Sequence, residues 1–216
     1  MPLTEYLVRM FGATRSAGAD KAKSMTEDGD GYVVPSWPPY TEMSRQGEGY
    51  SVITTSAVAG LVVRPSTVAK LTLYNGEGPG TGKSLIIDRA FAFNLVGAAS
   101  STYHIWLCVH QKGMTIPASD IAKGVTTNWK GNTGKQYNGS AIADIGATVV
   151  DDGWYPWGPS GSTVTVTTPG QAICAEVAGR LIVPPTSAIS IQVVADVTGA
   201  TFTCGLSWYE KYLPGV

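Results

Sequence analysis

Most of the chain after residue 50 is built from short apolar runs separated by glycine, proline and asparagine. Strands are predicted at 71–74, 85–95, 102–110, 163–167, 172–177, 180–183, 188–195 and 201–209. Side chains two residues apart lie on one face of a strand. Phe202, Cys204, Leu206 and Trp208 are therefore expected to share one face of the last strand. About eight short strands joined by turns predict an all-β fold, either a β-sandwich, a jelly roll or a barrel.

The segment 85–95 shows the same alternation with one interruption. Its expected apolar face is made of Leu85, Ile87, Phe91, Phe93 and Leu95, and Arg89 interrupts it. The segment 111–162 breaks the pattern, because it is rich in Gly, Asn, Trp and Lys. It is predicted to be a long loop excursion with one short helix near 119–122.

The first 50 residues differ in character from the rest. They hold 12 of the 31 charged residues and have too little apolar mass for a core of their own. A short helix is predicted near 3–11, a small polar linker over 13–31, and a proline-locked extended stretch over 32–40. We therefore expect 1–50 to be an extended assembly arm and 51–216 to be the domain. The expected contact residues of the arm are Leu3, Leu7, Met10, Phe11, Val33, Val34, Trp37 and Tyr40.

Composition narrows the possible functions. Charged residues make up 14% of the chain and the formal net charge is −1, which excludes broad electrostatic attraction to nucleic acid or acidic membrane. At 44% hydrophobic residues the chain is not expected to be disordered. The N-terminus lacks an uninterrupted apolar stretch of a secretory signal, so synthesis in the cytosol is expected. The cysteines, Cys108, Cys174 and Cys204, are expected to be free thiols.

Two motifs resemble chemical sites and fall short of them. The run 76–84 resembles a phosphate-binding loop, but Glu77 stands where glycine is needed and a strand follows, so a hairpin loop is expected. His104, Cys108 and His110 share a strand face and are residue types that bind zinc. They span about 20 Å along the strand, which is too long for one tetrahedral ion. No nucleophile motif accompanies the two histidines. We therefore predict no catalytic residues, no cofactor and no metal.

Aromatic side chains are the strongest binding feature of the sequence. They are Trp129, Tyr137, Trp154, Tyr155 and Trp157. Such rings could anchor a subunit interface, or they could stack on sugar in a carbohydrate-binding module or host-adhesion lectin. The low charge favours the interface, and the carbohydrate-binding module remains the alternative.

Two segments resemble jelly-roll structural proteins of bacteriophage virions. The first is Leu71-Thr72-Leu73-Tyr74-Asn75 with its glycine loop and Gly82-Lys83-Ser84-Leu85-Ile86-Ile87; the second is Arg180-Leu181-Ile182-Val183-Pro184-Pro185 with the later Trp208-Tyr209-Glu210. The resemblance covers about 55–214. It implies an antiparallel β-sandwich of jelly-roll type serving as a capsid, decoration or minor virion protein.

Such a protein is non-enzymatic, is made in the host cytoplasm and resides in the virion. Its expected partners are copies of itself, in a trimer or larger symmetric assembly, and other virion proteins. Direct contact with nucleic acid or membrane is not expected, and a glycan is a possible ligand.

Overall fold

The computed structural model describes residues 41–80, 82–97, 100–113, 125–130, 141–163 and 171–213, with backbone only for 41, 42, 45 and 125–130. The chain divides into two compact units, Met1–Pro39 and Tyr40–Val216, and the described residues all belong to the second. The predicted helices near 3–11 and 119–122 and the arm residues up to Tyr40 lie outside the described residues. The predicted boundary at residue 50 falls inside the first described strand.

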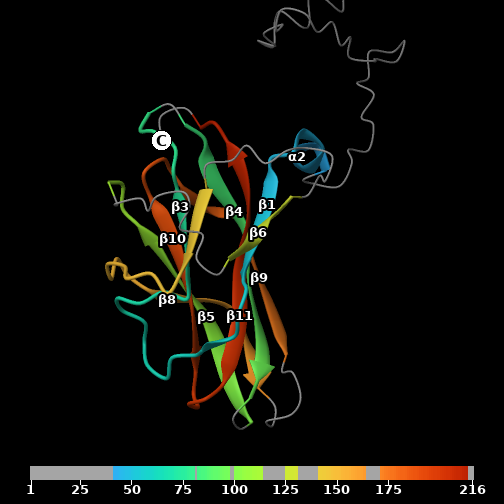
Figure 1. Cartoon of the computed structure of the whole chain (residues 1–216), viewed down its shortest axis with the longest axis vertical. Helices are drawn as coiled ribbons and strands as arrows, with labels where there is room; N and C mark the ends of the chain where they lie inside the picture. Colours follow the sequence, from blue (N-terminus) through green and yellow to red (C-terminus); the bar gives the residue numbers. More distant parts are fainter. Residues whose placement is uncertain are drawn as a thin grey trace, which may run out of the picture. The chain divides into compact units, whose positions relative to one another are not determined.

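The described residues form strands and one short helix (Figure 1). The elements are α2 (Thr41–Gln46), β1 (Gly49–Thr54), β2 (Val58–Ala59), β3 (Leu71–Asn75), β4 (Ser84–Val96), β5 (Ser101–His110), β6 (Val125–Lys130), β7 (Ala141–Ile145), β8 (Tyr155–Thr163), β9 (Ala172–Val183), β10 (Ala188–Ala195) and β11 (Thr201–Lys211). The prediction of an all-β fold is confirmed.

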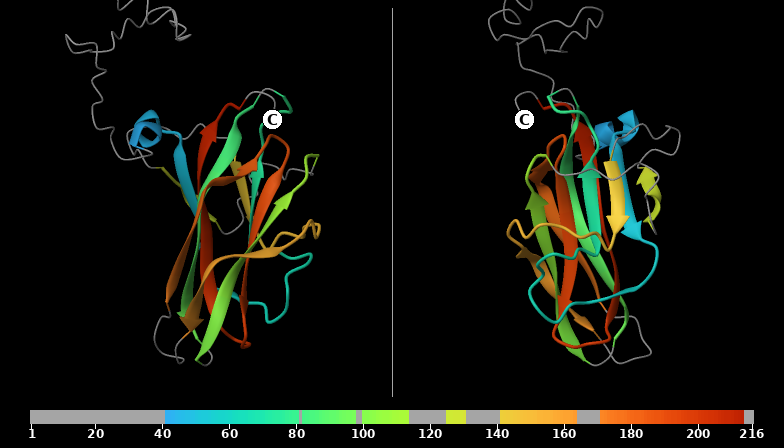
Figure 2. Two further views of the ribbon diagram at one scale, coloured as in Figure 1. Left: turned by 180° about the vertical axis from the view of Figure 1, so that it is seen from behind. Right: turned by 60° about the vertical axis from the view of Figure 1, so that its left-hand side comes forward.

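The strands form two antiparallel sheets. One sheet has the order β6-β1-β11-β4-β9, with β2 also paired to β11, and we call it the β4 sheet. The other has the order β7-β3-β10-β5-β8, and we call it the β5 sheet. Figure 2 shows the two sheets from two further sides.

One apolar core joins the inner faces of the two sheets. The β4 sheet contributes Leu85, Leu206 and Trp208, and the β5 sheet contributes Leu73, Ile105 and Ile189, among others. The side chains of Leu85, Leu206, Leu73, Ile105 and Ile189 are all fully buried. The predicted shared face of Phe202, Cys204, Leu206 and Trp208 is confirmed, since all four side chains are at most 2% exposed.

Two predictions about connections are wrong. The loop 76–83 is not a hairpin, because β3 belongs to the β5 sheet and β4 to the β4 sheet, so the loop crosses between sheets. The excursion 111–162 is not merely a loop, because β6, β7 and most of β8 lie in it. The edge positions of these three strands in their sheets explain the weak signal, since edge strands need less apolar sequence.

The predicted face of 85–95 is also wrong, and a β-bulge is the reason. On β11, Ser207 pairs with Arg89 and Trp208 pairs with Ile87, so Asp88 is an extra residue in β4. One extra residue exchanges the two faces of the strand beyond it. Leu85 and Ile87 therefore face the core, as do Ala90 and Ala92, whereas Phe93 and Leu95 are exposed.

A buried carboxylate lies at the far end of β11. Glu210 is 1% exposed, and its Oε1 accepts a hydrogen bond of 3.2 Å from the indole Nε1 of Trp208. Its Oε2 is buried and has no hydrogen-bond partner among the described residues. Burial raises the pKa of Glu210, and the hydrogen bond from Trp208 only partly opposes this. The ionised form of Glu210 is therefore disfavoured in the folded protein.

We predict that Glu210→Gln stabilises the protein at neutral pH. A carboxyl group whose pKa is higher in the folded state binds its proton more tightly there. The free energy of unfolding therefore falls as the pH rises from the pKa of the unfolded state to that of the folded state. Replacing Glu210 should raise the free energy of unfolding by about 1 kcal/mol at pH 7 and by little near pH 4. Urea unfolding at both pH values measures this, and equal effects at the two would contradict it.

Candidate functional site

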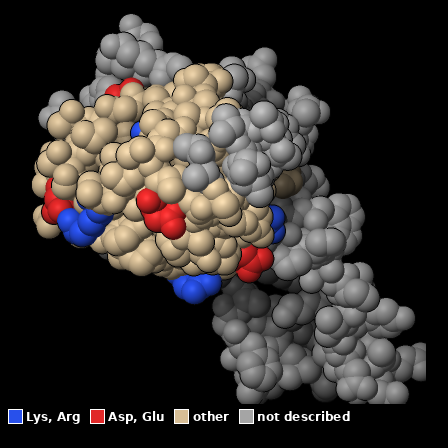
Figure 3. Space-filling model, turned by 90° about the horizontal axis from the view of Figure 1, so that it is seen from below, with Lys and Arg blue, Asp and Glu red and all other residues tan. Residues whose placement is uncertain are grey.

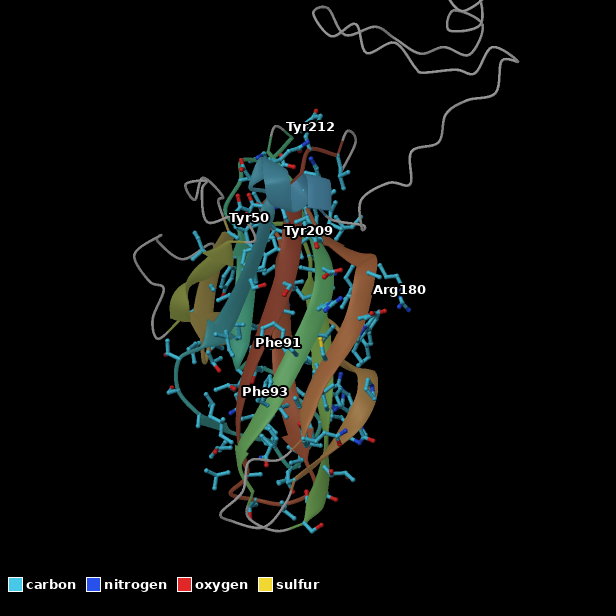
Figure 4. All side chains as sticks on the ribbon, turned by 90° about the vertical axis from the view of Figure 1, so that its right-hand side faces the viewer. Tyr50, Phe91, Phe93, Arg180, Tyr209 and Tyr212 are labelled. Atoms are coloured by element: carbon cyan, nitrogen blue, oxygen red, sulfur yellow. The ribbon has the colours of Figure 1, made fainter. Side chains whose placement is uncertain are left out.

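The outer face of the β4 sheet, which points away from the β5 sheet, carries large apolar side chains. The bulge at Asp88 places Phe91, Phe93 and Leu95 on this face. Phe93 is 45% exposed and Leu95 is 39% exposed. On the neighbouring β9, Cys174 pairs in register with Phe91 and is exposed. Figure 4 shows Phe91 and Phe93 on β4, beside β9.

Gly205 on β11 makes room for the Phe91 ring. The two residues pair in register, and a Cβ added to Gly205 would lie 2.4 Å from Cζ of Phe91 and 2.1 Å from the carbonyl oxygen of Val52. Both distances are far below van der Waals contact. The ring therefore covers the bare backbone of Gly205, which explains why Phe91 is less exposed than Phe93.

Charged side chains on this face carry both signs. Arg89 follows the bulge, and its Nε lies 3.5 Å from Oδ2 of Asp88. Glu176 of β9 pairs in register with Arg89 and is exposed. Figure 3 views the protein from below rather than onto this face, and the charged groups that it shows among the described residues are also few and of both signs. The part of this face formed by β4 and β9 thus combines apolar side chains with charges of both signs.

The predicted aromatic cluster is divided between two faces. Trp154 precedes β8, is 4% exposed and donates a hydrogen bond of 2.7 Å from Nε1 to the carbonyl of Ser66. It packs with Ala69, Cys108 and Val149 in a second apolar cluster, separate from the main core. The Trp154 side chain is therefore buried in the fold and offers little surface to a ligand.

Tyr155 and Trp157 lie together at the edge of the β5 sheet. Their ring centroids are 5.6 Å apart in an edge-to-face arrangement. The Trp157 indole Nε1 donates a hydrogen bond of 3.1 Å to the carbonyl of Glu176, which links β8 to β9. The guanidinium carbon of Arg180 lies 5.5 Å from the centroid of the Trp157 ring. One face of the indole is therefore occupied by a cation–π contact.

The three predicted rings whose side chains are described, Trp154, Tyr155 and Trp157, do not form one flat platform. Trp129 lies in β6, where only the backbone is described, and Tyr137 lies outside the described residues. The carbohydrate-binding alternative stays a prediction that rests on Tyr155 and Trp157. All predicted arm residues, from Leu3 to Tyr40, also lie outside the described residues.

Sequence reasoning missed a buried polar network in the β5 sheet. Nδ1 of His110 lies 3.1 Å from Oδ2 of Asp152, and its Nε2 lies 2.7 Å from Oγ of Ser190. The Ser190 Oγ lies 2.8 Å from Oγ1 of Thr72. With Nδ1 as donor to the carboxylate, Nε2 accepts from Ser190 and Ser190 accepts from Thr72. The network joins β3, β10 and β5 to the loop before β8.

The connectivity of Asp152, His110 and Ser190 is that of a nucleophilic triad. The side chains of His110 and Ser190 are buried, at 1% and 0% exposure. A substrate carbonyl therefore cannot reach the Ser190 hydroxyl in this conformation. The three residues lie 42 and 80 positions apart, so no local spacing in the sequence could have indicated the network.

The predicted histidine–cysteine face is only partly brought together. Cys108 Sγ lies 3.9 Å from Nδ1 of His110, and both side chains are buried, whereas His104 is exposed. Within the described ranges, no three His, Cys, Asp or Glu side chains are grouped so that they could hold a metal ion. No helix in the described part of the chain is long and apolar enough to cross a membrane.

Comparison with known proteins adds no relative: no family model, curated protein or solved structure matches the chain. Any function assigned to the protein therefore rests on its sequence and on the geometry of the described residues.

We predict that the His110 network is structural. His110→Ala should lower the free energy of unfolding by about 2–3 kcal/mol, because the Ser190 hydroxyl stays buried without its acceptor. Asp152→Asn should have a smaller effect, since Asp152 is exposed and the amide oxygen still accepts a hydrogen bond. Urea unfolding measures both, and a fluorophosphonate probe should leave folded protein unlabelled. Labelling of Ser190 would contradict the structural role.

Proposed function

We propose that the protein is a non-enzymatic virion structural subunit, a jelly-roll β-sandwich that assembles with copies of itself into a symmetric oligomer or lattice. The observation that carries the proposal is the strand order of the two sheets. The protein would serve as a capsid, decoration or minor structural subunit, with other virion proteins as further partners. Synthesis in the host cytoplasm and residence in the virion belong to the same proposal.

The strand order supports a jelly roll because eight strands form four nested antiparallel pairs. β1 pairs with β11, β3 with β10, β4 with β9, and β5 with β8. The first strand of this set thus pairs with the last, the second with the seventh, and so on inward. The pairs alternate between the β4 sheet and the β5 sheet.

This alternation arises when one long antiparallel hairpin is wrapped around a core. A double-sheet fold of eight strands and two Greek keys is the jelly roll, which occurs in viral capsid proteins, lectins and cupins. β6 and β7 extend the two sheets beside β1 and β3, outside the nested set. Their position at sheet edges leaves the wrapping of the other eight strands unchanged.

Among these classes, the surface favours the virion subunit. Phe93, Leu95 and Ile182 are exposed on the outer face of the β4 sheet, where an assembly contact needs apolar area. The low charge of the chain suits association with copies of itself more than with nucleic acid. The sequence resemblance to virion proteins supports the same class.

We predict that full-length protein forms a multimer and that deletion of residues 1–40 prevents it from building the full particle. The deletion ends before α2, so β1 and its buried Tyr50 are kept. Light scattering coupled to size exclusion gives the native mass, and negative-stain images give the symmetry. A 22.6 kDa monomer of full-length protein would contradict the proposal.

The thermal unfolding of the truncated chain serves as the control. It should remain cooperative, because the apolar core formed by the described residues lies entirely after residue 40. Normal particles from the truncated chain would contradict the assembly role of the arm. They would leave the proposal of a self-assembling virion subunit unchanged.

A further inference from the structure

We propose that the outer face of the β4 sheet is the surface on which two copies of this chain meet, related by a twofold axis. The inference rests on the proposed function in one respect, namely that the chain associates with itself. It goes further by naming the surface and its partner. The residues that carry it are Phe93 and Leu95 of β4, Cys174 and Ile182 of β9, and the charged pair Arg89 and Glu176.

The distribution of large and small side chains on β4 supports this. Beyond the bulge, the inward positions hold Ala90 and Ala92, and the outward positions hold Phe93 and Leu95. Removing the apolar surface of a phenylalanine or leucine side chain from water is a gain in stability for the state that buries it. In the isolated chain a little under half of that gain is unused at Phe93, which is 45% exposed. A partner that covers it would recover the gain.

The relief of the face suits a second copy. Phe93 pairs in register with Thr203 on one side and with Ala172 on the other. A large ring therefore stands between two shorter side chains in this row of the sheet. A twofold contact requires a patch that is complementary to itself, and a projecting ring beside shorter side chains can meet the same arrangement on a second copy.

The charges on the face also favour a second copy of the chain as the partner. A surface that must meet its own copy needs either no charge or both signs. Arg89 and Glu176 occupy registered positions on neighbouring strands, both exposed, and they carry opposite signs. Rotation by 180° can bring Arg89 of one copy opposite Glu176 of the other. A strongly acidic or strongly basic partner would find no matching field here.

The area of the face is sufficient for a modest interface. The four strands β1, β11, β4 and β9 lie side by side. At about 4.8 Å between strands and roughly nine residues of length, they present on the order of 600 Å². Stable interfaces bury about 600–1,000 Å² on each partner. The face reaches the lower end of that range.

The test is Phe93→Glu in the full-length chain, with Val150→Glu as the matched control. Both residues are exposed apolar side chains, at 45% and 63%, and Val150 lies outside the β4 sheet. Sedimentation across a concentration series should show self-association through this face weakened at least tenfold in Phe93→Glu and unchanged in Val150→Glu. Unchanged circular dichroism of Phe93→Glu would establish that the variant is folded.

Cys174 gives an independent measurement on the same face. It is exposed, whereas Cys108 and Cys204 are buried, so a maleimide should react with Cys174 first. In associated wild-type protein the reaction should be at least tenfold slower than in Phe93→Glu. Cys174→Ser, which lacks the thiol on the face, measures the background from the other two cysteines.

The outcomes separate the inference from the proposed function. A wild-type chain that stays monomeric at all concentrations overturns both. A wild-type oligomer that persists in Phe93→Glu, with Cys174 equally reactive in both proteins, overturns the surface and leaves the proposed function standing. Dissociation by Phe93→Glu together with slow labelling of wild-type Cys174 supports the surface.

Discussion

The packing of the two sheets depends on one irregular crossing between β4 and β9. Asp88 is an extra residue in β4. On β9, Glu176 pairs with Arg89 and Leu181 pairs with Ile87, so the four residues 177–180 of β9 lie opposite Asp88. Ala178 and Gly179 there have positive φ values of 51° and 75°. The crossing lets Leu85 and Ile87 fill one part of the core and Ala90 and Ala92 another. It also turns Phe91, Phe93 and Leu95 outward. The same irregularity in β4 and β9 therefore determines which side chains fill the core and which form the candidate interface.

The strands with uninterrupted alternation could be predicted from sequence. β10 is observed at Ala188–Ala195, as the pattern predicts, and β11 buries the four residues expected to share its face. The proposed jelly-roll arrangement could be suggested only by resemblance, because strand order depends on pairs such as β1 with β11 that are far apart in the chain. Period-two patterning constrains a strand and its faces, but it does not choose the neighbouring strand.

What the sequence could not indicate depends on insertions and on long-range contacts. A bulge is a one-residue event, and Asp88 beside Arg89 looks like any polar interruption of an apolar face. Trp154 looks like an exposed aromatic because its neighbours include Asp152 and Gly153, but it meets the carbonyl of Ser66. The His110 network needs groups from three strands and a loop. Each of these features is set by tertiary contacts and leaves no local pattern.

The contact between Trp157 and Glu176 affects how this protein behaves when crowded. β9 is the last strand of its sheet, and a bare strand edge is a template for further strands and for cross-β fibrils. Here the Trp157 indole takes up one backbone carbonyl of that edge, Arg180 lies over the indole, and the irregular segment 177–180 interrupts the strand. Extension of the sheet along β9 is therefore obstructed. We therefore expect copies of the chain to associate on this side without adding further strands to β9.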